Sequence, residues 1–337
     1  MPYVPLHERI DPPSRAIRYA SPDLDPRAPL VTDSPAMSDD EAGPSRKRRR
    51  GGDGDGEDGG APNGEPEPRA SYTPRGPAAI APSIFGIAPR NEFTKVVGEF
   101  IMAHCRGREN VEVEIKLGTL HAPGDGPPRR VRMPAMTEAI VPSDWPVGRF
   151  ASTMNKKQHF ALNGLLNSAV EGAARTPTPL KFFRARQVDS FHSAQGGKVR
   201  VSRDPQGAVI PDGVVKKSNI AHLNVYSPRE AFDWRVSCNT ETPAELPTSP
   251  AQNTRQKDRA CYRHQLCQVD LTVVTARESA HDPKAHITYE LEIEILDVPA
   301  LIAEGEKEER GDPNNRFDEI LQSVLDTARM LIKNVNA

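Results

Sequence analysis

The sequence predicts an α+β protein in which eight antiparallel strands close into a β-barrel with a charged lumen and α-helices packed outside. Segments that alternate apolar and polar residues follow one another with loops rather than helices between most of them, as in antiparallel barrels. These segments carry charged side chains on one face and apolar side chains on the other. Three amphipathic segments of helical period need an apolar surface to lie against. A barrel that is ionic inside and apolar outside accounts for all three observations.

The helices are expected where apolar residues recur every three or four positions. Asn91 stands directly before the first of these segments, where its side chain can cap the helix. The predicted helices cover residues 91–105, 155–174 and 317–335.

The strands are expected where the apolar residues recur at every second position, because successive side chains of a strand point to opposite faces. The predicted strands cover residues 111–120, 180–188, 198–202, 213–223, 231–239, 261–274 and 287–296, with a weaker candidate at 137–141.

The first and last strands each carry a row of acidic residues on one face. Two carboxylates about 7 Å apart on a strand face repel each other by about 2 kcal/mol at an effective dielectric near 20. A polar face that looks at water is the commoner arrangement for an antiparallel sheet, but a row of like charges is unusual there. A closed barrel places basic residues of the middle strands and a divalent metal ion opposite these acids. The acidic residues are Glu112 and Glu114 in the first strand, with Lys116 on the same face, and Glu290, Glu292 and Glu294 in the last.

Composition excludes several other protein classes. The chain has 337 residues and a net charge of -2. No apolar stretch is long enough to cross a bilayer and the start lacks the apolar segment of a signal peptide, so we expect a soluble, intracellular protein without a membrane partner. Four cysteines without metal-binding spacing are too few for a disulfide framework, and we expect them to be reduced and buried.

Residues 1–81 differ in composition from the rest of the chain. They are rich in Pro, Gly, Ser and Asp, which predicts a disordered tail before a domain at 82–337. Within this tail, residues 46–50 are all basic. Such a cluster is typical of a nuclear localisation signal, although a solvated block of charge is the plainer interpretation.

Five short motifs carry a resemblance to a known family. `EVEIK` at 112–116 and `YELEIEI` at 289–295 lie at opposite ends of the predicted domain, and `KVRVSRD`, `RQKDR` and `QVDLT` lie between them. In this order they resemble the fungal-type RNA 5′-triphosphatases, which form the β subunit of the mRNA capping apparatus. That family belongs to the triphosphate tunnel metalloenzyme superfamily, and the resemblance covers residues 82–337.

The resemblance implies a metal-dependent reaction that converts a 5′-triphosphate RNA end to a diphosphate end and phosphate. It implies Mg²⁺ or Mn²⁺ as cofactor, since hard oxygen ligands suit these ions, with Glu112, Glu114 and Glu294 as ligands. Glu241 resembles the carboxylate that helps to place the attacking water.

The remaining candidate residues bind phosphate or organise the residues that do. Arg200, Lys257 and Arg259 match phosphate-binding positions of the family, whereas Lys198 and Arg235 are candidates by strand parity and Lys116 by its register with two metal ligands. One lysine of the pair Lys216 and Lys217 is expected to bind phosphate, and the sequence leaves open which. The residues expected to hold cations or water around the site are Asp270, Thr272, Glu290 and Glu292.

The family also implies a nuclear homodimer that acts on triphosphate-ended RNA together with the mRNA guanylyltransferase. Some relatives capture that partner with a tryptophan-containing peptide before the catalytic domain. Here no tryptophan precedes Trp145, which favours recruitment through the transcription machinery instead. Two alternatives stay open: an inorganic, thiamine or nucleoside triphosphatase of the same superfamily, and a non-catalytic barrel that binds RNA ends or polyphosphate.

Overall fold

The computed structural model describes residues 80–194, 197–277 and 285–335. The predicted tail at 1–81, with the basic cluster at 46–50, lies outside these residues except for its last two positions. The strands and helices discussed below all belong to the compact unit that begins at Pro89. None of the helices in the described ranges combines the length and the apolar composition that a membrane crossing requires.

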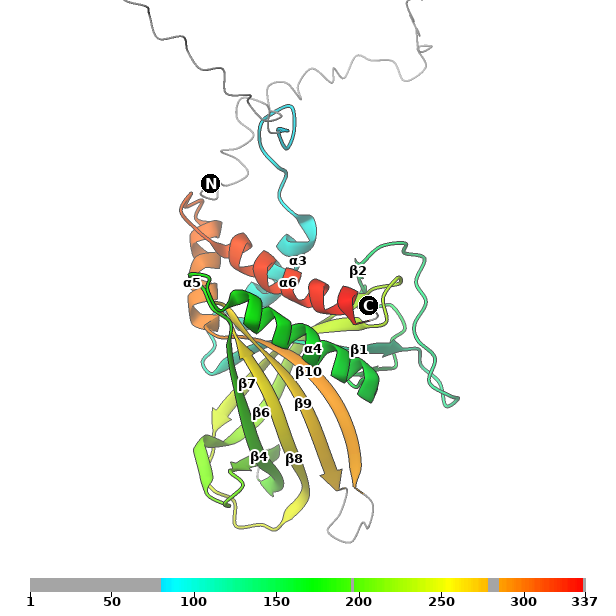
Figure 1. Ribbon diagram of the computed structural model, residues 1–337, viewed down its shortest axis with the longest axis vertical. Helices are drawn as coiled ribbons and strands as arrows, with labels where there is room; N and C mark the ends of the chain where they lie inside the picture. Colours follow the sequence, from blue (N-terminus) through cyan, green and yellow to red (C-terminus); the bar gives the residue numbers. More distant parts are fainter. Residues whose placement is uncertain (1–79, 195–196, 278–284, 336–337) are drawn as a thin grey trace, which may run out of the picture. The chain divides into compact units, whose positions relative to one another are not determined.

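Eight strands form a closed antiparallel barrel, which confirms the predicted fold class (Figure 1). The strands follow the circular order β1-β7-β6-β5-β4-β8-β9-β10, and pairing of β10 with β1 closes the circuit. The barrel strands are β1 (Val111–His121), β4 (Lys181–Ala194), β5 (Gly197–Arg203), β6 (Val209–Tyr226), β7 (Asp233–Pro243), β8 (Ala251–Arg263), β9 (Cys267–Arg277) and β10 (His286–Ile295). Two short strands, β2 (Ala139–Ile140) and β3 (Arg149–Ala151), pair with the ends of β6 and β1.

The prediction of a single strand at 261–274 is wrong. The chain turns there, with the backbone N–H of His264 donating to the carbonyl of Cys267 at 3.0 Å, so that β8 ends and β9 begins. Neither glycine nor proline marks this turn in the sequence, and the start of β8 contains too few apolar residues to show alternation. As a result `RQKDR` lies on a barrel strand.

Four helices lie outside the barrel, one more than expected in the described part of the chain. Three match the predictions, and the Asn91 side chain accepts a hydrogen bond from the N–H of Thr94 at 3.2 Å, as expected of a cap. The helices are α3 (Glu92–Cys105), α4 (Lys156–Ala173), α5 (Val298–Glu309) and α6 (Phe317–Asn334). Helix α5 escaped prediction because its second half is almost entirely charged and carries Gly305. That glycine permits close packing, since a methyl group in its place would overlap the sulfur of Met102 on α3.

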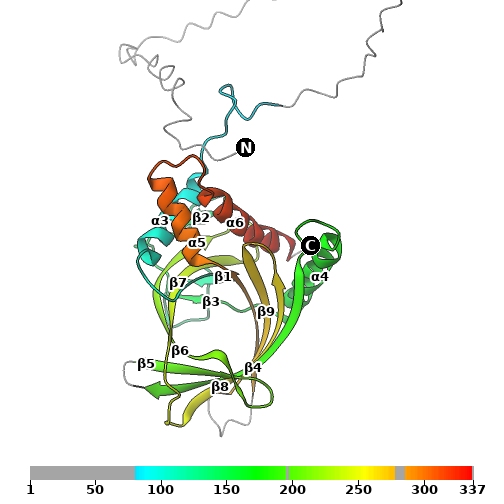
Figure 2. The ribbon, with the colours of Figure 1, turned by 90° about the vertical axis from the view of Figure 1, so that its left-hand side faces the viewer.

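The hydrophobic core lies between the barrel and the helices rather than inside the barrel. Buried Val113, Ile115 and Ile293 of β1 and β10 belong to the same cluster as Leu321 and Leu325 of α6. Helices α3, α5 and α6 lie over the side formed by β1, β7 and β10, while β4, β5 and β8 lie away from them (Figure 2). The four cysteines are free and buried, as expected. Because the apolar faces point outward to the helices, the polar faces enclose the lumen.

Candidate active site in the barrel lumen

Strand register brings the two acidic rows together inside the barrel. Residues paired across antiparallel strands point to the same face. Glu114 of β1 pairs with Glu294 of β10, and Lys116 pairs with Glu292. These four side chains, together with Glu112 two residues before Glu114, therefore share one wall of the lumen.

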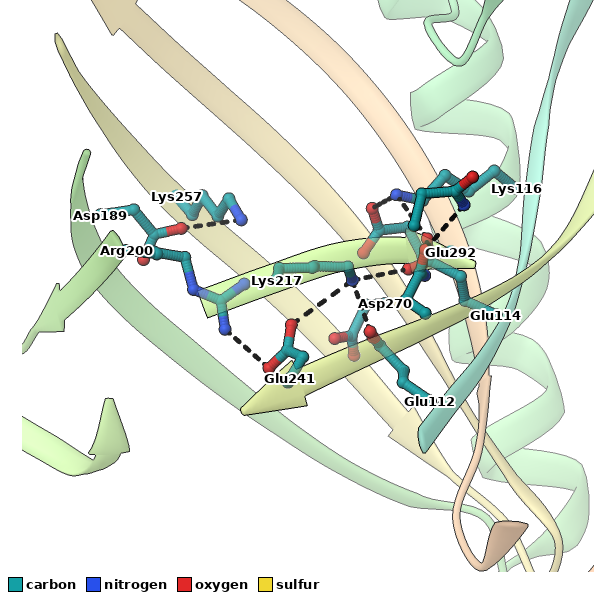
Figure 3. A network of polar contacts seen from close by, with 12 residues as sticks. Glu112, Glu114, Lys116, Asp189, Arg200, Lys217, Glu241, Lys257, Asp270 and Glu292 are labelled. Carbon is teal, nitrogen blue, oxygen red and sulfur yellow. Dashed lines mark hydrogen bonds and ion pairs between the residues drawn. The ribbon is translucent and has the colours of Figure 1, made fainter. Parts of the chain in front are cut away.

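Lys217 of β6 connects three of the lumen acids (Figure 3). Its Nζ lies 2.5 Å from Glu112, 3.3 Å from Glu114 and 3.4 Å from Glu241. Glu241 also accepts a hydrogen bond from Arg200 Nη2 at 2.9 Å. Burial alone would raise the pKa of Glu241, but Arg200 and Lys217 outweigh it and hold that pKa below its ordinary value. Glu241 is therefore an ionised group fixed by two cations.

Lys216 is not part of this network. It alternates to the opposite face of β6, where its side chain packs near Gly197. A β-bulge lies between Asn219 and Ala221. Odd-numbered residues of β6 face inward before the bulge, and even-numbered residues face inward after it. Of the two lysines that the sequence left open, the structure places Lys217 in the lumen.

Lys116 joins the first strand to the last. Its Nζ lies 3.1 Å from Glu114 and 3.0 Å from Glu292. Burial opposes ionisation of Glu292, yet Lys116 and Lys257 lower its pKa to about 2. Burial likewise opposes the charge on Lys116, and the two carboxylates raise its pKa above the ordinary value. Both partners are thus charged at neutral pH.

Lys257 of β8 is held by Asp189 of β4, a residue that the sequence did not suggest. Asp189 is fully buried and lies 2.8 Å from Lys257 Nζ, while Ser202 and Gln187 each donate a hydrogen bond to it at 2.7 Å. Burial and the neighbouring Arg259 lower the pKa of Lys257, and Asp189 opposes that effect. The predicted strand ended one residue too early, at 188. Continuing its alternation from Gln187 to Asp189 would have found this carboxylate.

Several buried polar atoms of the lumen form no hydrogen bond within the described residues. Arg200 Nε, Arg259 Nε and Thr272 Oγ1 are buried and accept or donate no hydrogen bond within the described residues. Buried donors are almost always paired in folded proteins, so unpaired ones call for an explanation. Two guanidinium groups with free donors in one lumen fit an anion that is not part of the chain.

The carboxylates of β1 and β10 provide a donor set for a divalent cation. Glu294 forms no hydrogen bond or ion pair with any described residue. Desolvation inside the barrel, followed by the charges of Glu112 and Asp270, raises its pKa to about 7. Burial likewise raises the pKa of Glu112, with a further contribution from Glu114. Carboxylate oxygens are the ligands that Mg²⁺ and Mn²⁺ prefer, and a cation would relieve this repulsion. Among the described residues, no three His, Cys, Asp or Glu side chains lie close enough together to hold a metal ion. The chemistry of Glu112, Glu114 and Glu294 nevertheless fits such an ion.

The other predicted residues lie on β9 and β10 beside these acids. Asp270 lies 3.8 Å from Arg259 and accepts a hydrogen bond from the Gln268 amide. Glu290 pairs with Thr272, and burial followed by Glu292 raises its pKa.

Two predicted phosphate-binding residues lie apart from this network. Lys198 is exposed on β5. Arg235 of β7 donates from Nε to Asn224 Oδ1 at 2.8 Å and stacks on Phe150.

Comparisons with known proteins agree with this geometry. The family described as the mRNA capping enzyme, beta chain, matches residues 87–337. The mRNA-capping enzyme subunit beta of Cryptococcus neoformans is 43% identical over 99% of both chains. The subunit of the same name from Schizosaccharomyces pombe is 32% identical over 71% of this chain and 80% of its own length.

Solved structures show the same similarity. The structure of the S. pombe Pct1 RNA triphosphatase superimposes with a TM-score of 0.70 at 29% identity, covering 77% of this chain and 99% of that one. A second structure, of Pct1 in complex with the Spt5 CTD, has a TM-score of 0.70 at 30% identity over 76% of this chain and 99% of that one.

Proposed function

Because this chain belongs to the mRNA capping enzyme beta chain family, we propose that it is the RNA 5′-triphosphatase of mRNA capping. It removes the γ-phosphate from the 5′-triphosphate end of nascent mRNA, the first step of cap formation. The reaction is a hydrolysis. Water attacks the γ-phosphorus, the bond from that phosphorus to the β–γ bridging oxygen breaks, and a diphosphate RNA end leaves.

One observation carries this proposal: a closed lumen holds a crowded acidic row together with arginines whose buried Nε donors make no hydrogen bond among the described residues. The acids of β1 and β10 suit a cation, and Arg200 and Arg259 suit an anion. Phosphoryl transfer depends chiefly on positioning and on neutralising the charge of the phosphate oxygens. An enclosed site that holds both charge types is suited to a triphosphate.

Glu112, Glu114 and Glu294 would hold Mg²⁺ or Mn²⁺, which supplies positive charge to the γ-phosphate oxygens when bound. The chain's own cations complete the cradle. Arg200 and Arg259 offer Nε donors that make no hydrogen bond within the described residues. Lys257, fixed by Asp189, lies on the same strand as Arg259.

Glu241 is the candidate for placing the attacking water. Arg200 and Lys217 fix its two oxygens, so that the carboxylate can accept a hydrogen bond from water in one orientation. Since its pKa is lowered, Glu241 is a weak base and orients the water rather than taking up its proton. The proton passes to the orthophosphate product.

The setting of the enzyme follows from the same family membership. We propose that residues 82–337 form the catalytic domain and that the protein acts in the nucleus as a homodimer alongside the mRNA guanylyltransferase. The structure of Pct1 with the Spt5 CTD supports recruitment through the transcription machinery.

The test is release of labelled phosphate from γ-labelled triphosphate-ended RNA with Mg²⁺, with tripolyphosphate and thiamine triphosphate as competing substrates. We expect RNA to be the preferred substrate and Glu241→Gln to lower the rate by roughly 100-fold, as for loss of a group that handles the reacting water. Glu171→Gln, on the exposed surface of α4, makes the same chemical change outside the site. No release from RNA would refute the function, and a preference for tripolyphosphate would favour an inorganic triphosphatase.

A further inference from the structure

A pocket of about 620 Å³ lies between the segment 141–150 and strands β6 and β7. Its apolar side contains the half-buried rings of Trp145 and Phe150, and its polar side contains His222, Asn224 and Arg235. The volume falls within the range of small-molecule sites, as does the mixture of aromatic walls with a few polar groups. None of these residues takes part in the acid and lysine network described above.

The pocket is continuous with the lumen along β7. Arg235 pairs with Lys116 of β1 and with Asn224 of β6, so all three point inward. Four residues further along β7, Asn239 donates a hydrogen bond to Glu114 Oε1 at 3.0 Å. Glu114 itself pairs with Ser237, two residues from Arg235. The acidic wall therefore lies about 7–13 Å along the strand from Arg235, a distance comparable with the length of a triphosphate chain and the nucleoside attached to it.

Arg235 is a half-buried cation without an acidic partner in the described part of the chain. Its Nε is occupied by Asn224, and its guanidinium lies over the Phe150 ring at 4.6 Å from the centroid. Burial lowers the pKa of Arg235 to about 10. A partly desolvated guanidinium beside an aromatic ring gains strongly from a phosphate ligand.

The remaining groups fit a nucleobase rather than more phosphate. Bases bind proteins by stacking on aromatic rings and guanidinium planes, with hydrogen bonds to their edges. Burial and Arg235 lower the pKa of His222, which keeps its imidazole neutral and able to donate and accept one hydrogen bond each. Trp145 and Phe150 would add nothing to the binding of an inorganic phosphate chain.

We propose that this pocket binds the 5′-terminal nucleoside of the triphosphate-ended RNA, with the base against Phe150 and Trp145 and the α-phosphate at Arg235. The proposal rests on the function proposed above and adds the way in which substrates are distinguished. A nucleoside at this position favours RNA ends and nucleoside triphosphates over tripolyphosphate, because only the former fill the aromatic pocket.

The test compares kcat/KM for triphosphate-ended RNA, a nucleoside triphosphate and tripolyphosphate in the wild type and in Phe150→Leu and Trp145→Leu. Loss of one stacking ring should lower the ratio of RNA to tripolyphosphate kcat/KM by roughly tenfold, with a similar fall for the nucleoside triphosphate. Phe160→Leu is the matched control, because this ring is 77% exposed on α4, outside the barrel. Phe150 and Trp145 both also pack against the small cluster around Leu120, so thermal unfolding of each variant shows whether the fold is kept.

The possible outcomes separate this inference from the function itself. An unchanged substrate ratio in both variants, or an equal loss on all three substrates, would overturn the nucleoside pocket. Loss on RNA alone would place a later nucleotide there and contradict the assignment to the first nucleoside. A wild type that hydrolyses tripolyphosphate but not RNA would instead refute the proposed function, and a wild type inactive on every substrate would refute both.

Discussion

The buried carboxylate of Asp189 offers a sharp test of how the lumen holds its cations. Replacing it by asparagine keeps the size of the side chain and an oxygen that can accept from Ser202 and Gln187, but removes the charge that faces Lys257 at 2.8 Å. Since Asp189 is fully buried, solvent water does not reach this position to stabilise the lysine charge. The substitution therefore leaves Lys257 without its ion-pair partner, and Glu292 remains as the carboxylate that favours its charge.

The structure sets the size of the effect on stability. Removing one partner of a buried ion pair costs about 3–5 kcal/mol, so we expect Asp189→Asn to lower the free energy of unfolding by about that amount. Asp258→Asn on β8 is the matched control. Its carboxylate pairs on the outer face with Arg184, whose side chain is 58% exposed, and an exposed pair contributes only about 0–1 kcal/mol. Denaturant unfolding of both variants measures the difference.

The same substitution has a predicted pH signature in catalysis. Burial and Arg259 already lower the pKa of Lys257, and Asp189 counteracts them. Without Asp189 the pKa of Lys257 falls further, so that the lysine loses its proton at a lower pH than in the wild type. The loss of kcat/KM in Asp189→Asn should therefore shrink as the pH is lowered, relative to the wild type at each pH. A loss that does not depend on pH, or a stability change equal to that of the control, would refute this reasoning.

Three further predictions concern the acids, the lysine pair and the helix layer. The pKa of Glu294 is raised from 4.5 to about 7, so the folded metal-free protein binds this proton more tightly than the unfolded chain does. The thermal midpoint of the wild type should therefore fall as the pH rises from about 4.5 to about 7, and it should fall less in Glu294→Gln. Identical pH profiles of the two proteins would contradict the raised pKa of Glu294. In phosphate-release assays, Lys217→Gln should lower kcat/KM by roughly 100-fold, as for removal of a charge-stabilising donor, whereas Lys216→Gln should leave kcat/KM unchanged. A loss of kcat/KM in Lys216→Gln but not in Lys217→Gln would mean that the register of β6 is wrong. Gly305→Ala should lower the free energy of unfolding by about 1–3 kcal/mol, because the added methyl overlaps Met102, and denaturant unfolding without any change would show that α3 and α5 are not so close.

The acidic strands could be predicted because their alternation is local. The period of two in β1 and β10 fixes which residues share a face, and a row of carboxylates requires cations nearby. Strand pairing itself was not visible in the sequence. The structure adds that Glu114 lies directly opposite Glu294, so the two ends of the domain meet in one wall.

Other features depend on information that alternation does not carry. The bulge in β6 places Lys217 and Asn219 inward before it and His222 and Asn224 inward after it. Counting back from His222 without the bulge would have selected Lys216. A bulge adds one residue without changing composition, which is why the sequence left the pair open.

Polar segments were the other source of error. Much of β8 faces solvent on one side and a charged lumen on the other, so it lacks the apolar alternation that marks a strand, and the turn before Cys267 has no glycine or proline. Helix α5 buries little more than Val298, Leu301 and Gly305. In both segments tertiary contacts, rather than local pattern, decide the structure.

We propose that the carboxylates of β1 and β10 bind the divalent ion on which γ-phosphate removal depends. The most direct test is a titration of the wild-type protein, Glu294→Gln and the surface control Glu171→Gln with Mn²⁺. Electron paramagnetic resonance measures the free ion at each step. We predict Mn²⁺ binding by the wild type and by Glu171→Gln, and affinity at least about tenfold weaker in Glu294→Gln, as for loss of a charged ligand. Equal affinity in all three proteins, or no binding by the wild type, would contradict the account.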